Sequence, residues 1–209
     1  MLLLYVKNAK KQEKWQKSQL YFYRFFTLCY NRFTMNIKEK LISGNNRFIK
    51  NINSNHELKD KVNSLKNEQS PYALIVTCSD SRVVPELIFD TSLGELFVIR
   101  SAGNVINEGE LASIEYGLNH LNIKCVIVLA HTHCGAVHAS IHKGKGEYLS
   151  CILDNISEVA EPNLSEEEVS FRNASKQVNY ILEKFPLYDG EIYPALYDIE
   201  TGKVVFGKR

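Results

Sequence analysis

The sequence predicts an α/β fold: a mainly parallel β-sheet flanked by helices, in a single domain with an N-terminal helical extension. Three observations favour this class. From residue 35 onward, short β-rich runs alternate with longer segments of helical periodicity. The short runs are continuously apolar, as in strands that are covered on both faces. Each run ends in a cluster of polar residues. This placement suits a parallel sheet, because ligands bind at the carboxyl ends of parallel strands.

The first expected elements are an amphipathic helix over 36–50 and a strand over 73–77, Ala-Leu-Ile-Val-Thr. Two further apolar runs, over 96–99 and 125–130, predict the next strands. The polar clusters that follow these three strands begin at Cys78, Arg100 and His131. Strands that alternate with helices in this way favour a parallel sheet.

Two longer helices follow from their apolar spacing. Over 110–121 the apolar residues lie three, four and three apart on one helix face: Leu111, Ile114, Leu118 and Leu121. Ser165 with Glu168 forms a capping box that opens a second helix, which ends before Pro186. The residues expected to point inward from this helix are Val169, Ala174, Val178, Ile181 and Leu182.

The last elements form a hairpin. Runs over 193–197 and 204–206 flank the segment 198–203, and its Thr-Gly pair suits a tight turn. We find no internal repeat and no linker after residue 35, so one domain is expected over 35–209.

Composition limits the classes of function. The chain has 209 residues, 44% hydrophobic and 23% charged, with a formal net charge of +1, which is typical of a folded globular chain. It lacks a stretch of about 18 continuous apolar residues, so we expect no stable membrane insertion. The near-zero charge gives no electrostatic footprint for nucleic acid.

Residues 1–34 differ from the rest of the chain. They carry five Lys and two Arg against one Glu, and nine of the 22 aromatic residues. A basic segment poor in acidic residues suits a transit-like or membrane-surface role. We favour the alternative, in which this extension adds nothing to the core. In one version of this alternative, translation starts at Met35.

The cysteines do not form a disulfide pattern. Their number is odd, they are thinly spread, and no export signal precedes them: Cys29, Cys78, Cys125, Cys134 and Cys151. These features indicate a reducing, cytoplasmic location, with a metal or catalytic use for some of the thiols.

Two of the polar clusters contain metal-ligand side chains. Cys78 follows the first strand, and His131 and Cys134 follow the third. Two thiolates and one imidazole suit zinc, and three protein ligands with an open fourth position are the catalytic arrangement. Asp80 lies two residues from Cys78, so it is a possible fourth ligand in a closed site. Arg82 can hold the Asp80 carboxylate bidentately and pull it off the metal.

At these residues the sequence resembles the β-class carbonic anhydrases. The matching segments are Cys78-Ser79-Asp80-Ser81-Arg82, Arg100-Ser101-Ala102-Gly103-Asn104 and His131-Thr132-His133-Cys134-Gly135-Ala136. They stand in the order of the family, and with the helix over 110–121 and the closing segment over 197–202 the resemblance covers roughly residues 36–207.

The resemblance implies one Zn²⁺ per chain on Cys78, His131 and Cys134, with Asp80 and Arg82 as the catalytic pair. It implies reversible hydration of carbon dioxide to bicarbonate by a zinc-bound hydroxide. A homodimer or larger homo-oligomer is implied too, in which the helix over 36–50 wraps a partner subunit.

The second segment, Ser101, Ala102, Gly103 and Asn104, is expected to back the substrate pocket. Two departures from the family pattern are Ala130, where Gly is usual before the ligand His, and Ser101, where Asn is usual. His133 and His138 lie near the ligands, but the sequence does not identify a proton shuttle.

Three other functions remain open from the sequence. A carbon disulfide or carbonyl sulfide hydrolase would use the same scaffold and metal. A non-catalytic zinc protein that binds bicarbonate would have no evident need for Asp80 and Arg82. A thiol redox protein using Cys78 and Cys134 is disfavoured, because the chain lacks a Cys-x-x-Cys pair.

Overall fold

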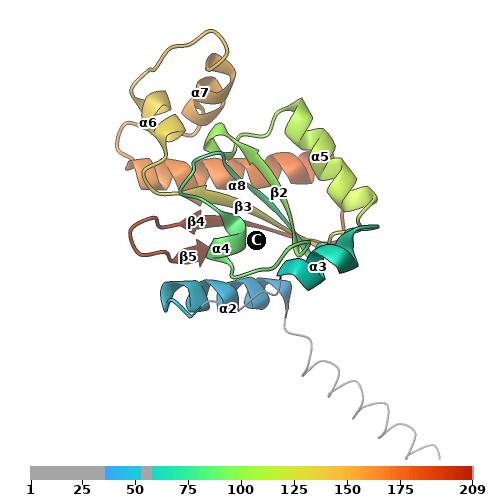
Figure 1. The fold of residues 1–209 in the computed structure, drawn as a ribbon. Helices are drawn as coiled ribbons and strands as arrows, with labels where there is room; N and C mark the ends of the chain where they lie inside the picture. Colours follow the sequence, from blue (N-terminus) through green and yellow to red (C-terminus); the bar gives the residue numbers. More distant parts are fainter. Residues whose placement is uncertain (1–35, 53–57, 209) are drawn as a thin grey trace, which may run out of the picture. The chain divides into compact units, whose positions relative to one another are not determined.

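Five strands form one sheet in the order β2-β1-β3-β4-β5 (Figure 1). The strands are β1 (Ala73–Cys78), β2 (Leu96–Ser101), β3 (Cys125–His131), β4 (Glu191–Tyr197) and β5 (Val204–Phe206). The first four strands are parallel to one another, and β5 pairs antiparallel with β4. The predicted parallel sheet and the closing hairpin are therefore confirmed.

The structure is a computed structural model, and it describes residues 36–52 and 58–208. The expected extension over 1–34, with Cys29, and the alternative start at Met35 lie outside the described residues. Residues 37–209 group into one compact unit. None of the helices within the described ranges has the length and apolar character needed to cross a bilayer.

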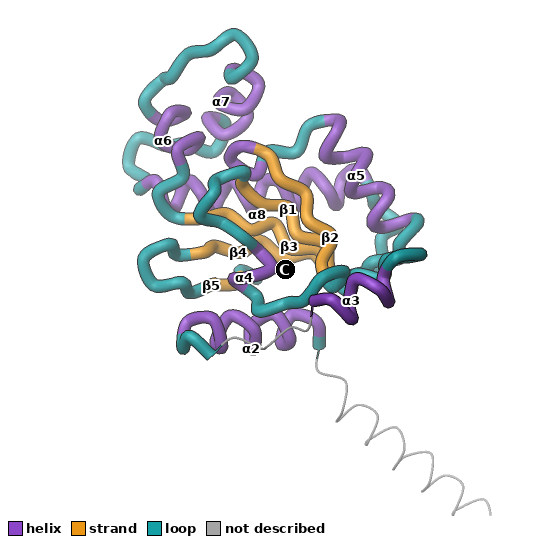
Figure 2. The backbone as a smooth tube through the Cα atoms, viewed as in Figure 1, coloured by secondary structure: helices purple, strands orange, loops and turns teal. Residues whose placement is uncertain are grey.

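Helices cover both faces of the sheet, as the continuous apolar strands predict. On one face, α5 (Glu108–Asn119) and α8 (Glu166–Lys184) pack against side chains such as Leu74, Val126 and Val128. On the other face, α2 (Ile37–Ile49) and α4 (Pro85–Ile88) pack against the alternate side chains of the same strands, such as Ile75 and Ile127. Figure 2 shows α8 behind the strands and α4 in front of them. A further helix, α3 (Leu58–Leu65), precedes β1.

The cap of α8 forms as predicted. Ser165 Oγ accepts a hydrogen bond from the Glu168 amide at 3.2 Å, and the Glu168 carboxylate accepts one from the Ser165 amide at 2.8 Å. Four of the five inward residues are buried, but Leu182 is 38% exposed. The prediction for Leu182 is wrong, because this residue is rotated by about 100° from Ile181 and leaves the apolar stripe.

The other long helix starts earlier than its apolar spacing indicates. It spans α5 rather than residues 110–121, because a cap at Asn107 starts it: the Asn107 amide donates to the Glu110 carboxylate at 3.0 Å. Leu121 lies beyond the helix end, where it still packs against the core.

Helix α2 is held by one buried side chain. Asn45 donates from Nδ2 to the carbonyls of Ile88 at 3.1 Å and Gly202 at 2.8 Å, and its Oδ1 accepts from the Val204 amide at 2.9 Å. These bonds join α2 to α4 and to the β4–β5 hairpin. The predicted helix over 36–50 is thus part of the core.

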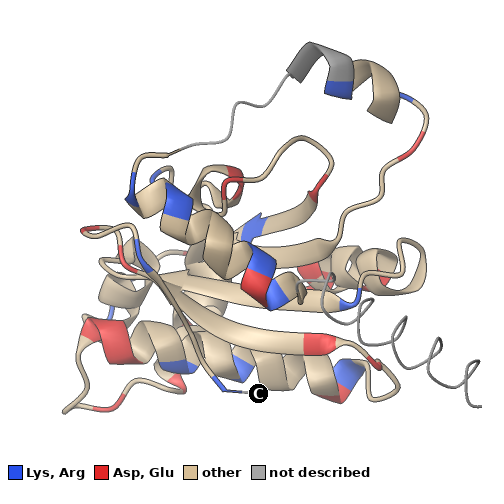
Figure 3. Ribbon diagram, turned by 90° about the horizontal axis from the view of Figure 1, so that it is seen from below, with Lys and Arg blue, Asp and Glu red and all other residues tan. Residues whose placement is uncertain are grey.

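Two short helices, α6 (Gly135–Ile141) and α7 (Ser150–Ser157), follow β3, and a 3₁₀ turn over Ala102–Asn104 follows β2. A small apolar cluster joins these elements at the carboxyl ends of the strands: Cys78, Val105, Cys134, Val137, Ile156 and Val169. Acidic and basic residues are interspersed over the elements seen in Figure 3, in line with the low net charge.

Candidate metal centre

The three predicted ligands meet at the ends of two adjacent strands. Cys78 ends β1, His131 ends β3, and Cys134 directly precedes α6. All three are buried, and their ligand atoms lie within 4.8 Å of one another. The two Sγ atoms are 4.0 Å apart, too far for a disulfide bond of about 2.05 Å. Two Zn–S bonds of about 2.3 Å at a tetrahedral angle place the sulfurs about 3.8 Å apart.

One nitrogen of His131 lacks a partner. Nδ1 lies 2.8 Å from the Thr132 carbonyl, which can only accept, so Nδ1 carries the hydrogen. Nε2 therefore holds a lone pair, and it is buried with no hydrogen-bond partner. An unpaired buried polar atom is costly, and a cation between this nitrogen and the two thiols would satisfy it. The residues present therefore fit a zinc ion.

The two thiols differ in acidity. The Cys134 thiol, aided by backbone amides, lowers the pKa of Cys78 to about 4. One of these amides belongs to Gly103, whose nitrogen is 3.2 Å from the Cys78 sulfur. The Cys78 thiolate in turn raises the pKa of Cys134. The second proton therefore leaves most readily when a cation replaces it, as metal binding requires.

Asp80 and Arg82 form the predicted bidentate pair. Arg82 Nε donates to Asp80 Oδ1 at 2.9 Å, and Nη2 donates to Oδ2 at 2.8 Å. The Arg82 guanidinium holds the pKa of the Asp80 carboxyl well below its usual range. The carboxylate is not among the three side chains whose ligand atoms cluster. The closed site with Asp80 as fourth ligand stays a prediction.

Two arginines fix the backbone around the pair. Arg100 donates to the carbonyls of Cys78 at 3.2 Å and Asp80 at 2.7 Å. Arg82 also donates to the His133 carbonyl at 3.1 Å. The residues after β1 are thereby tied both to the end of β2 and to the loop that carries Cys134. No role for Arg100 was predicted from the sequence, because its partners are backbone atoms.

The segment predicted to back the substrate pocket lies beside Cys78. Ser101 closes the turn by donating to the Val105 carbonyl, and Gly103 has a left-handed φ of 63°. A Cβ at Gly103 would approach the Ile156 side chain to 2.7 Å, so glycine lets its amide reach the sulfur. Ala102 lies in the same turn, and Asn104 is buried. A contact with substrate stays a prediction for all four residues.

A buried polar network supports this turn from behind. Asn173 donates from Nδ2 to the Gly103 carbonyl at 2.8 Å, and its Oδ1 accepts from Gln177 at 3.1 Å. Gln177 also donates to Asn155 Oδ1 at 2.8 Å and accepts from the Ile106 amide at 3.1 Å. The sequence analysis missed this network. The sequence signal for it was the pair Asn173 and Gln177, two amide side chains four residues apart on the apolar face of α8.

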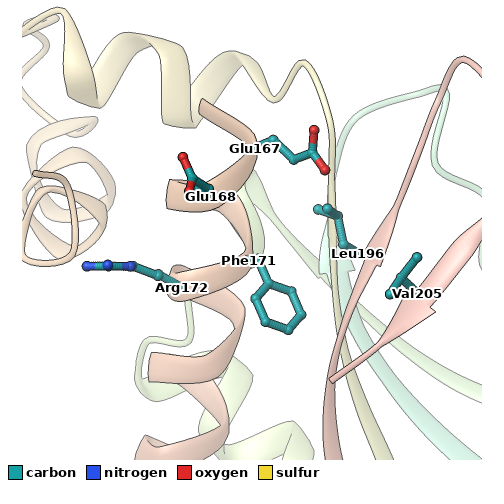
Figure 4. A pocket seen from close by; sticks show the side chains of 6 residues that line it. All are labelled: Glu167, Glu168, Phe171, Arg172, Leu196 and Val205. Carbon is teal, nitrogen blue, oxygen red and sulfur yellow. The ribbon is translucent and has the colours of Figure 1, made fainter. Parts of the chain in front are cut away.

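Two of the cavities differ in character. One of about 420 Å³ adjoins the ligand loop and is mainly polar: Thr132, His133, Ser165, Glu166, Glu167, Asp198 and Glu200. Another of about 360 Å³ lies between α8 and the β4–β5 hairpin, where Phe171 points toward Leu196 and Val205 (Figure 4). Neither cavity is lined by a predicted ligand or by Asp80 or Arg82.

Of the other cysteines and histidines that the structure describes, none belongs to this ligand set. Cys125 is buried in the core, and burial raises its pKa to about 12, while Cys151 is exposed. His133 pairs with Glu200 at 3.0 Å.

The fold is α/β, and three side chains at the carboxyl ends of its parallel strands form a group that could hold a metal ion. A sequence profile of the carbonic anhydrase family matches residues 73–204. The carbonic anhydrase of Synechococcus elongatus is 34% identical over 193 residues, which cover 79% of this chain and 70% of that protein. The chain belongs to the carbonic anhydrase family, in its β-class.

Solved structures agree with this assignment. The β-carbonic anhydrase CcaA gives a TM-score of 0.61 at 31% identity, over 83% of this chain and 96% of that chain. The Coccomyxa β-carbonic anhydrase in complex with acetazolamide gives 0.61 at 26% identity, over 70% of this chain and 77% of that chain. The predicted fold class and family are therefore confirmed.

Proposed function

We propose that the protein catalyses the reversible hydration of carbon dioxide to bicarbonate and a proton, with one zinc ion held by Cys78, His131 and Cys134. The observation that carries the proposal is the unpartnered, buried Nε2 of His131 between two buried thiols. Family membership supports the proposed reaction, and this geometry supports a metal ion at this position.

Each residue of the site has a role in this reaction. Zinc, when bound, acidifies a water molecule and so supplies a nucleophile at mild pH. Asp80 accepts a hydrogen bond from the attacking oxygen and thereby directs its lone pair at the carbon. Arg82 holds both carboxylate oxygens and keeps Asp80 ionised at the pH of the reaction. Arg100 holds the backbone on which Asp80 sits.

The turn at Gly103 also supports the metal in this proposal. Its amide donates to the Cys78 sulfur and draws charge from the thiolate. A less electron-rich sulfur would leave a bound zinc ion more acidic, which would offset part of the effect of two anionic ligands. We place carbon dioxide beside the same turn, which carries Ala102, Gly103 and Asn104.

The quaternary structure and the location are part of the same proposal. We expect a homodimer or larger homo-oligomer in the cytoplasm, and no nucleic acid or membrane partner. Sedimentation equilibrium tests the oligomer; a monomer at micromolar concentration would contradict it. Acetazolamide, which the Coccomyxa enzyme binds, is a suitable probe of inhibition here.

The test is stopped-flow hydration of carbon dioxide from about pH 6.5 to 9, on protein whose zinc content is measured. Beside the wild type we would assay Asp80→Asn, with Asp189→Asn as matched control, since Asp189 pairs with Lys124 at the surface. We expect near one zinc per chain, activity that rises with pH, and a loss of about 10²-fold or more in Asp80→Asn only.

Other outcomes would each point elsewhere. Full zinc content without hydration at any pH would refute the proposed reaction while leaving the ligand set intact. Hydrolysis of carbon disulfide or carbonyl sulfide by the same sample would then identify the alternative enzyme. Bicarbonate binding without turnover of any of these substrates would indicate the non-catalytic alternative.

A further inference from the structure

A second group of metal-ligand side chains lies outside the site described above. His138 is in α6, His142 caps the C-terminal end of the same helix, and Glu166 is the first residue of α8. Their ligand atoms lie within 4.8 Å of one another. In the part of the chain that the structure describes, this is the one such cluster besides Cys78, His131 and Cys134.

The helix geometry brings the two imidazoles together. Residues four apart in a helix lie on one face, and the rings of His138 and His142 have their centroids 4.2 Å apart. His142 Nδ1 lies 2.9 Å from the His138 carbonyl, which can only accept, so Nδ1 carries the hydrogen. Nε2 of His142 is therefore left with a lone pair for a cation.

Glu166 supplies the anionic donor from another helix. Its Oε1 lies 2.7 Å from Nδ1 of His138, although the two residues are 28 positions apart. The side chains of His138 and Glu166 are 61% and 37% exposed. Water can therefore reach the cluster and complete a coordination shell, and little desolvation opposes the entry of an ion.

The donor set selects the class of cation. Two imidazoles and one carboxylate are a ligand set for zinc and for similar divalent transition ions, whereas magnesium and calcium prefer oxygen ligands. The C-terminal end of α6 carries partial negative charge, which also favours a cation beside His142. An ion here would connect the end of α6 to the start of α8.

We infer that His138, His142 and Glu166 form a second binding site for a divalent transition-metal ion, distinct from the Cys78–His131–Cys134 centre. The exposed site binds more weakly than the buried one, because its carboxylate and imidazoles remain open to water and to protons. This inference does not depend on the proposed reaction.

The experiment measures metal content after equilibrium dialysis of the full chain against buffered Zn²⁺, with Mg²⁺ as the comparison ion. The variants are His142→Ala and Glu166→Gln, and the matched control is His120→Ala, because His120 is exposed and stands outside both clusters. The wild type and the control should take up a second equivalent of zinc that saturates at higher free Zn²⁺. The two variants should keep the first equivalent and lose the second.

A spectroscopic readout identifies the donors. Cu²⁺ added to the zinc-loaded wild type should give an electron paramagnetic resonance spectrum with hyperfine splitting from imidazole nitrogen, absent in His142→Ala. The inference is overturned if the wild type takes up one equivalent only, or if His142→Ala and Glu166→Gln retain the second. Loss of the second equivalent in His120→Ala would overturn it as well.

Discussion

Replacement of Asn173 by alanine tests how the metal centre is supported from the interior. Asn173 is fully buried, and its side chain donates to the Gly103 carbonyl and accepts from Gln177. In Asn173→Ala the Gly103 carbonyl loses this partner where water does not reach. The turn that aims the Gly103 amide at the Cys78 sulfur is then free to move.

The magnitude follows from these contacts. Leaving one buried carbonyl unsatisfied costs about 1–3 kcal/mol. The space left by the amide group adds about 1 kcal/mol more, as for other small buried deletions. We therefore expect the free energy of unfolding to fall by about 2–4 kcal/mol. Asn173 holds the turn whose Gly103 amide donates to the Cys78 sulfur. Loss of such a supporting hydrogen bond around a metal ligand also weakens metal affinity by about 10–100-fold.

The assay is urea unfolding of the zinc-loaded protein, combined with a zinc competition titration. The control is Asn179→Ala, an exposed asparagine on the same helix, which should change the free energy of unfolding by less than about 0.5 kcal/mol. If Asn173→Ala matches the wild type in both unfolding and zinc affinity, the argument that α8 supports the ligand turn is refuted.

Three further predictions concern the framework. Gly44→Ala should destabilise the protein strongly, because the added Cβ would lie 1.7 Å from the Phe89 carbonyl oxygen and push α2 off the sheet; thermal unfolding measures this. Ser165→Ala should cost about 1 kcal/mol in urea unfolding, since α8 loses its cap. Asp198→Asn should reduce the loss of stability in acid, because the Thr201 hydroxyl and nearby amides lower the pKa of Asp198 in the folded protein.

The sign of the last effect is fixed by the direction of the shift. A carboxyl with a lowered pKa contributes stability above its unfolded pKa of about 3.9, and loses it as the pH falls through the folded value. The loss of folding stability below about pH 4 should therefore be shallower in Asp198→Asn than in the wild type or in the control Glu115→Gln.

Asn46→Ala, exposed on α2, is the control for Gly44→Ala. Equal acid profiles, or a stable Gly44→Ala, would contradict these arguments.

The sheet was predictable from sequence because its signals are local. A continuously apolar run such as 125–130 predicts a strand, and it also predicts that both faces of that strand are covered. The bidentate pair of Asp80 and Arg82 was predictable for the same reason, since two residues of separation suffice to bring them together. Short helices were not predicted: α4 has four residues and α6 has seven, too few for a periodic pattern to emerge.

By itself the sequence determined the fold class and the family, and it singled out Cys78, His131 and Cys134 as the proposed metal ligands, because each of these inferences rests on residue type and order along the chain. The tertiary structure alone decided which nitrogen of His131 is free, and that Asn173 holds the Gly103 turn from 70 residues away. It also brought Glu166 to His138 across 28 residues. Such contacts depend on how helices dock on the sheet, and the packing of side chains from distant segments sets that docking rather than any local pattern.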